Sequence, residues 1–150
     1  MRPGLRSVGR LPIDADNRTA AEEDRDVRRI LIADDEHNIR HILDFSLNVE
    51  GFDVISAQDG EEAVLLAASE APDLIIMDVM MPGCGGVEAC RRLKADTRTR
   101  NIPVILLTAR SSREDREAGE AAGAAEYVTK PFSPQKVIDL VQSILGVAQE

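Results

Sequence analysis

Residues 30–37 read ILIADDEH: four apolar residues, Ile30–Ala33, followed at once by the acidic residues Asp34, Asp35 and Glu36. Adjacent carboxylates repel one another, and burial raises the free energy of their charged forms further. An apolar run that ends in carboxylates therefore predicts a buried strand whose end lies beside a positively charged group.

Four further apolar runs follow along the chain, and an amphipathic stretch separates each run from the next. Apolar runs of this length and continuity are typical of strands that are buried on both faces of a parallel sheet. We expect strands at Ile30–Ala33, Val54–Ser56, Leu74–Met77, Val104–Leu107 and Tyr127–Thr129.

The stretches between the runs have helical patterns with recognisable ends. Gly51 ends the first helix, and Ser133 and Pro134 are suited to the cap and the first turn of the last one. The first helix has a broad apolar face made of Ile39, Ile42, Leu43, Phe45, Leu47 and Val49. We expect helices at 38–49, 61–68, 87–93, 113–122 and 134–145. Five strand–helix units predict a doubly wound α/β fold with a five-stranded parallel sheet in the order 2-1-3-4-5.

Polar residues follow four of the five expected strands: Asp34 with Asp35, Asp78, Thr108 and Lys130. Ligands of doubly wound sheets bind at this edge, where the carboxyl ends of the strands meet. Three carboxylates there favour a hard cation such as Mg²⁺. With Lys130 and the Thr108 hydroxyl, that ion would form a cradle for a phosphoryl group, and Asp78 on the central strand would be the nucleophile. Taken singly, each residue could instead be a turn former, a helix cap or a solvated charge.

In this order, the segments ILIADDE, LIIMDVMMPGCGGVE, PVILLTA and GAAEYVTKPF resemble the receiver domain of two-component response regulators over residues 27–146. The resemblance implies that Asp78 accepts a phosphoryl group from a sensor histidine kinase or a phosphotransfer protein. It implies that Asp35 and Asp78 bind Mg²⁺ directly, that Asp34 acts mainly through water, and that the backbone carbonyl of Met80 is a further ligand.

The resemblance also implies a conformational switch. Lys130 would bond a phosphoryl oxygen, Thr108 would move toward the phosphoryl group, and Tyr127 would swing inward. The Lys130–Pro131 peptide bond would be cis. The protein would be no enzyme in the ordinary sense, because its chemistry would be limited to phosphorylation and dephosphorylation of itself.

Two features are particular to this sequence. Gly85-Gly86 replaces the Asp-Gly pair that the family often carries, in a loop that we expect to lie away from the site. Met80 and Arg110 follow the acceptor and the threonine by two residues, at positions that tune autodephosphorylation in similar proteins. We expect Arg110 to reach over the pocket and slow the attack of water.

The composition bounds the partners and the compartment. A net charge of -9 argues against direct contact with nucleic acid, and no apolar stretch is long enough to insert into a membrane. Cys84 and Cys90 favour free thiols in a reducing compartment, so we expect a cytoplasmic protein. Residues 1–26 are expected to be a flexible extension and 147–150 a short tail. With no output domain, the receiver would act by docking to a downstream protein or by relaying phosphate.

Two other functions fit a similar sheet. An Mg²⁺-dependent phosphohydrolase would carry a second Asp where this chain has Met80. A flavodoxin-like cofactor binder would need a phosphate-binding loop after the first strand. In this chain Asp34, Asp35 and Glu36 stand there and would repel the phosphate. His37 and His41 stand four residues apart, as metal ligands on a helix can, but no third ligand is evident and we interpret them as surface residues.

Overall fold

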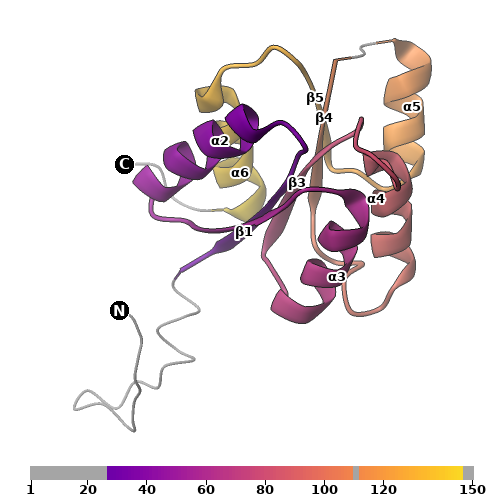
Figure 1. Ribbon diagram of the computed structural model, residues 1–150, viewed down its shortest axis with the longest axis horizontal. Coiled ribbons are helices and arrows are strands. Elements are labelled where there is room, and N and C mark those ends of the chain that lie inside the picture. The colour runs from indigo at the N-terminus through magenta and orange to yellow at the C-terminus, as the bar shows by residue number, and fades with distance from the viewer. Residues whose placement is uncertain (1–26, 110–111, 147–150) are drawn as a thin grey trace, which may run out of the picture.

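The computed structural model describes residues 27–109 and 112–146. Five parallel strands form one sheet, with helices on both of its faces (Figure 1). The strands are β1 (Arg29–Ala33), β2 (Asp53–Ala57), β3 (Leu74–Asp78), β4 (Val104–Thr108) and β5 (Glu126–Thr129). Their order is β2-β1-β3-β4-β5, which confirms the predicted topology.

Within the described ranges, four helices connect the strands and a fifth follows β5. One face of the sheet is covered by α2 (His37–Val49) and α6 (Pro134–Leu145). The other is covered by α3 (Gly60–Glu70), α4 (Gly86–Ala95) and α5 (Arg113–Ala121). The predicted helix ends are confirmed: the Ser133 hydroxyl accepts the Lys136 N–H at 3.2 Å, and Gly51 follows the end of α2 with a positive φ of 95°. None of the helices in the described ranges is long and apolar enough to cross a membrane.

Two apolar cores lie on opposite faces of the sheet because successive side chains of a strand point to opposite sides. Ile30, Ile32 and Ile76 pack under α2 and α6, whereas Leu31 and Ile75 pack under α3 and α4. All residues of the central strands β3 and β4 are buried. The expectation of burial on both faces is wrong for β2 and β5, which are edge strands with exposed and half-buried residues.

The broad apolar face expected for α2 is also wrong. Only Leu43 and Leu47 of this helix are buried. Ile42, Phe45 and Val49 are 44%, 67% and 66% exposed. Spacings of three and four residues put these three side chains on one side of the helix, so α2 has a second apolar stripe that faces solvent.

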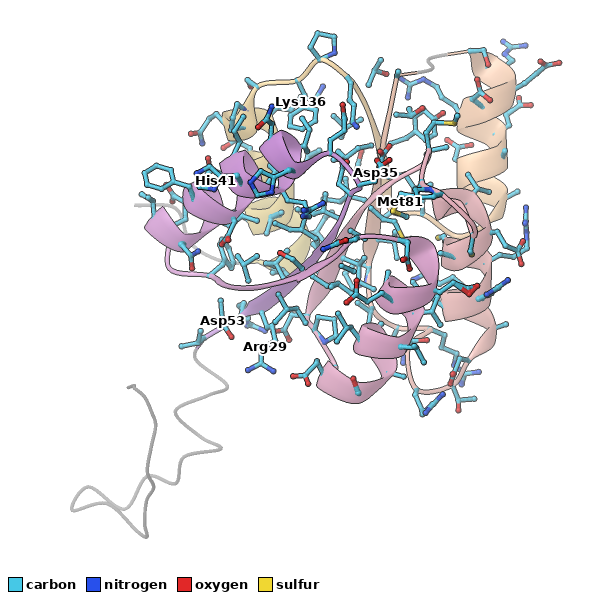
Figure 2. All side chains as sticks on the ribbon, in the orientation of Figure 1. Arg29, Asp35, His41, Asp53, Met81 and Lys136 are labelled. Atoms are coloured by element: carbon cyan, nitrogen blue, oxygen red, sulfur yellow. The ribbon has the colours of Figure 1, made fainter. Side chains whose placement is uncertain are left out.

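The strand register brings the polar strand ends together. Ala33 lies opposite Met77, so Asp34 follows β1 at the level where Asp78 ends β3. Asp78 lies opposite Leu107, and Thr108 comes next on β4. Figure 2 shows Asp35 at this carboxyl edge of the sheet, far from the amino edge marked by Arg29 and Asp53.

The two stripes of α2 predict different responses to truncation. Leu43→Ala should lower the free energy of unfolding by about 2–5 kcal/mol, because it leaves a cavity under the helix. Phe45→Ala should change it by less than about 0.5 kcal/mol, because the ring is exposed. Urea unfolding of the two variants beside the wild type measures both values. Equal losses would contradict the observed orientation of α2.

Candidate functional site

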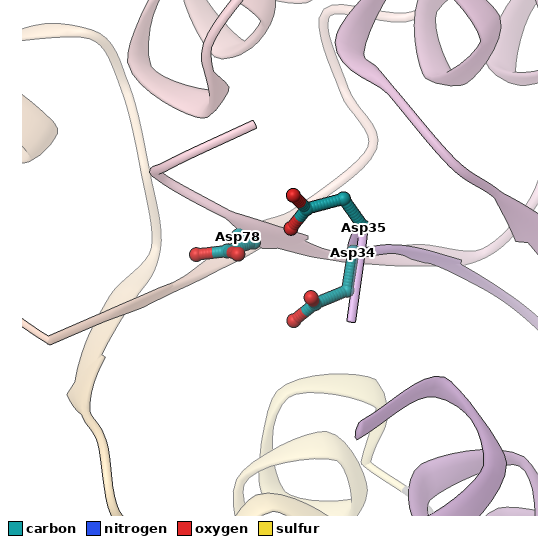
Figure 3. A group of neighbouring side chains, drawn as sticks. All are labelled: Asp34, Asp35 and Asp78. Atoms are coloured by element: carbon teal, nitrogen blue, oxygen red, sulfur yellow. The ribbon is translucent and has the colours of Figure 1, made fainter. Parts of the chain in front are cut away.

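Three carboxylates meet at the carboxyl edge of the sheet (Figure 3). Asp34, Asp35 and Asp78 each offer an oxygen that lies within 4.8 Å of the others. Asp34 and Asp78 are buried, while Asp35 is exposed to solvent. The arrangement follows from the pairing of β1 with β3, and it confirms that the sequence-predicted carboxylates converge.

Lys130 is the positively charged group that we expected beside the carboxylates. Its Nζ lies 3.3 Å from Asp34 Oδ2, 3.3 Å from Asp78 Oδ2 and 2.8 Å from Glu36 Oε1. The side chain is largely buried, so Lys130 is no solvated edge charge. Burial alone would lower its pKa, but the bond to Glu36 and the charges of Asp34 and Asp78 raise the pKa above its ordinary value. The ammonium group therefore stays charged at neutral pH.

Asp34 is the carboxylate whose charged form is disfavoured by its surroundings. Burial is the largest influence, and with the nearby charge of Asp78 it raises the pKa of Asp34 to about 6. The Glu36 N–H, at 2.8 Å from Asp34 Oδ1, and the Lys130 ammonium oppose this rise without cancelling it. Three converging carboxylates with one lysine are short of positive charge. This donor set fits a hard divalent cation, which needs oxygen ligands and only one or two carboxylates from the protein.

A side chain of α2 holds the turn that carries Asp34 and Asp35. Arg40, one turn into α2, donates from its guanidinium to the carbonyl oxygen of Asp34. Glu36 is the N-cap residue of α2, and its side chain makes no capping hydrogen bond. The alternative reading of Asp34 or Asp35 as a simple helix cap is therefore wrong.

The loop after β3 lies closer to Asp78 than we expected from the sequence. A Cβ on Gly86 would stand 2.3 Å from the carbonyl oxygen of Asp78, and one on Gly85 would stand 3.1 Å from that of Val79. The expectation that Gly85-Gly86 lies away from the site is wrong. The glycine pair lets α4 begin directly against the backbone of Asp78. Met80, exposed at the mouth of the site, donates its N–H to Asp78 Oδ1 at 3.2 Å.

The predicted switch residues occupy neighbouring strands. Thr108 is buried at the end of β4, and its carbonyl oxygen accepts the Lys130 N–H at 2.6 Å. Tyr127 on β5 is half-buried, and the Arg116 guanidinium lies 5.4 Å from the centre of its ring. Gly119 of α5 leaves room for this ring, because a Cβ there would stand 2.9 Å from Tyr127 Cδ2.

The other predictions made from the sequence have different outcomes. Arg110 lies outside the described residues, as do 1–26 and 147–150. The rings of His37 and His41 stack 6.2 Å apart on the exposed surface of α2, and the metal-capable cluster found among the described residues does not include them. Cys84 and Cys90 are free thiols, and the Lys130–Pro131 peptide bond is cis, both as predicted. The ion pair between Glu36 and Lys130 was not predicted from the sequence. The only signal for it was the place of Glu36 in the acidic triplet.

The raised pKa of Asp34 predicts a pH dependence of stability. The folded state binds this proton more tightly than the unfolded state, whose pKa is near 3.8, so stability falls as the pH rises from about 4 to about 6. The loss reaches at most about 3 kcal/mol, at about 1.4 kcal/mol per pKa unit. Asp34→Asn should remove this fall and raise the melting temperature at pH 7.

Thermal unfolding from pH 3.5 to pH 7.5 in metal-free buffer tests this prediction. Asp139→Asn is the matched control, because Asp139 is exposed on α6 and is not part of the acidic cluster. The wild type and this control should share one pH profile, and Asp34→Asn should diverge from both above pH 4. Three parallel profiles would show that Asp34 is not destabilised by its surroundings.

Comparisons with known proteins place this site in a family. The response regulator receiver domain model matches residues 30–142. The chain is 43% identical over 118 residues to the alkaline phosphatase synthesis transcriptional regulatory protein PhoP of Bacillus subtilis, covering 79% of this chain and 48% of that protein. It is 42% identical over 118 residues to the phosphate regulon transcriptional regulatory protein PhoB of Escherichia coli, covering 79% and 52%. The chain thus spans about half the length of these curated relatives.

Solved structures agree with the family match. The chemotaxis protein CheY4 of Vibrio cholerae superposes with a TM-score of 0.75 at 31% identity, covering 79% of this chain and 98% of that one. The receiver domain of the sensor histidine kinase PA1611 of Pseudomonas aeruginosa, solved with a magnesium ion coordinated in its active-site cleft, gives a TM-score of 0.74 at 31% identity, covering 80% and 98%. These matches favour the receiver over the phosphohydrolase and the flavodoxin-like binder. The chain belongs to the response regulator receiver domain family of two-component systems.

Proposed function

We propose that the chain is a phosphorylation-activated signalling switch that accepts a phosphoryl group on Asp78 from a sensor histidine kinase or a phosphotransfer protein. The observation that carries this proposal is the placement of Lys130, whose Nζ lies 3.3 Å from Asp78 Oδ2 beside two further carboxylates. Such a site combines an oxygen nucleophile with fixed positive charge, which phosphoryl transfer needs.

In the proposed reaction, an oxygen of Asp78 attacks the phosphorus of a phosphohistidine. The O–P bond forms, the P–N bond breaks, and its electron pair remains on the imidazole nitrogen. Lys130 neutralises charge on the phosphoryl oxygens, and the Thr108 hydroxyl donates to one of them. Asp34, Asp35, Asp78 and the Met80 carbonyl would hold Mg²⁺, which neutralises the remaining phosphoryl charge when it is bound.

The signal would leave the site through Thr108 and Tyr127. Phosphorylation adds about -1.5 to -2 of charge and strong acceptor oxygens, which draw the Thr108 hydroxyl toward the acceptor. Thr108 and Tyr127 lie on the paired strands β4 and β5, so a shift of one changes the space beside the other. The surface around α5 and β5 would then favour one set of downstream protein partners over another.

An apolar groove beside Lys130 offers a docking place for the phosphodonor. It encloses about 430 Å³ and is lined by Glu36, Ile39, Ile42, Ala109, Lys130, Pro131, Phe132 and Pro134. Because Lys130 borders both the groove and Asp78, a protein seated there can bring a phosphohistidine to the acceptor. One of the lining residues, Ile42, belongs to the exposed apolar stripe of α2.

We propose a cytoplasmic receiver that acts by docking to a downstream protein or by passing its phosphoryl group onward. The relatives PhoP and PhoB are named transcriptional regulators, and this chain spans only about half their length. That the receiver itself makes no nucleic-acid contact stays a prediction from its net charge of -9.

Incubation with acetyl phosphate and Mg²⁺, followed by intact mass measurement, tests the proposed function. The wild type and Asp139→Asn should each gain one phosphoryl group, and Asp78→Asn should gain none. Chelation of Mg²⁺ should reduce the yield at least about tenfold, since the site would lose much of its positive charge. A folded wild type that gains no phosphoryl group, even when sampled within seconds, would contradict the proposal.

The groove predicts a separation between protein and small-molecule donors. Ile42→Ala should slow phosphotransfer from a phosphorylated phosphotransfer protein by about tenfold, the effect of about 1.4 kcal/mol at an interface. It should leave phosphorylation by acetyl phosphate unchanged. Leu65→Ala, at a more exposed position on α3 outside the groove, is the control and should change neither rate. Equal slowing with both donors would place the defect in the site rather than in docking.

A further inference from the structure

Glu36 is the partner of Lys130 that faces solvent. Its Oε1 lies 2.8 Å from Nζ, closer than the 3.3 Å of the Asp34 and Asp78 oxygens. The Glu36 side chain is 59% exposed, whereas those of Asp34 and Asp78 are 0% and 4% exposed. Lys130 is therefore held by two buried carboxylates from within and by one exposed carboxylate from outside.

A phosphoryl group on Asp78 would have to compete for the same ammonium. Lysine has three donor hydrogens, and three carboxylates surround it already. Withdrawing Lys130 from Asp34 would leave a buried charge unpaired, which is costly. Withdrawing it from Glu36 exposes a carboxylate to water, and exposed ion pairs contribute little. Glu36 is thus the partner that Lys130 gives up at the lowest cost.

Building on the proposed function, we propose that Glu36 is a positioning residue that holds Lys130 in the unphosphorylated protein and is exchanged for a phosphoryl oxygen when Asp78 is modified. The Glu36 ion pair then opposes phosphorylation, and its strength sets how tightly the site retains the phosphoryl group. The carboxylate does this without touching the reacting atoms.

The backbone of Glu36 has a separate task, which makes the side chain testable alone. Its N–H donates to Asp34 Oδ1 at 2.8 Å, and this bond persists with any side chain. Glu36→Gln removes the charge at nearly constant shape. Glu36→Asp keeps the charge but shortens the side chain by one methylene, so it separates the direct contact with Lys130 from general repulsion of a phosphoryl group.

Binding of beryllofluoride, a phosphoryl mimic, at saturating Mg²⁺ measures the exchange. Fluorine NMR gives its dissociation constant for the wild type and each variant. Glu36→Gln and Glu36→Asp should both tighten binding by about two- to fivefold, the range of an exposed ion pair. Glu61→Gln is the matched control: Glu61 is 56% exposed and lies 3.0 Å from Arg92, so binding should stay at the wild-type value.

The outcomes separate the inference from the function on which it rests. Equal binding by the wild type and Glu36→Gln would overturn the role of Glu36 while the phosphoryl site stands. Tighter binding by Glu36→Gln together with wild-type binding by Glu36→Asp would also overturn it, because general repulsion would then explain the effect. A wild type that binds no beryllofluoride would refute the phosphoryl site, and the proposed function would fail with the inference.

Discussion

The burial of carboxylates at one edge of the sheet is the constraint on which the rest of this site depends. Asp34 and Asp78 are shielded from water, and Asp35 lies beside them. Burial, together with the nearby charge of Asp78, raises the pKa of Asp34 to about 6, and the single Lys130 ammonium does not cancel this rise. The buried carboxylates therefore favour the binding of a further cation. Such an electrostatically unfavourable cluster is typical of a functional site and not of a stable core.

The buried central strands and the contacts around them hold the carboxylates close together despite their repulsion. Central strands β1, β3 and β4 have buried apolar residues on both sides, so their carboxyl ends are fixed relative to one another. Gly86 lets α4 begin against the Asp78 backbone, and Arg40 secures the turn after β1. The stability of the two apolar cores offsets the unfavourable electrostatics at the strand ends.

Sequence reasoning located the strands and the acidic cluster because both depend on local pattern. Apolar runs such as Leu74–Met77 have few alternatives to a buried parallel strand, and the topology then brings their ends together. It failed where tertiary context decides. Which face of α2 is buried depends on the angle at which the helix meets α6, and the contact of Gly86 with Asp78 depends on a loop path that no pattern encodes.

The most direct test of the account is the effect of Mg²⁺ on stability at pH 7. If the carboxylate cluster is short of positive charge, added Mg²⁺ should raise the melting temperature in proportion to the logarithm of its concentration once the site is filled, stabilising the fold by about 2.7 kcal/mol at a hundredfold excess over the dissociation constant. Sodium chloride at matched ionic strength should give a much smaller rise. Equal rises with the two salts would show that Lys130 already satisfies the cluster, and would contradict the account.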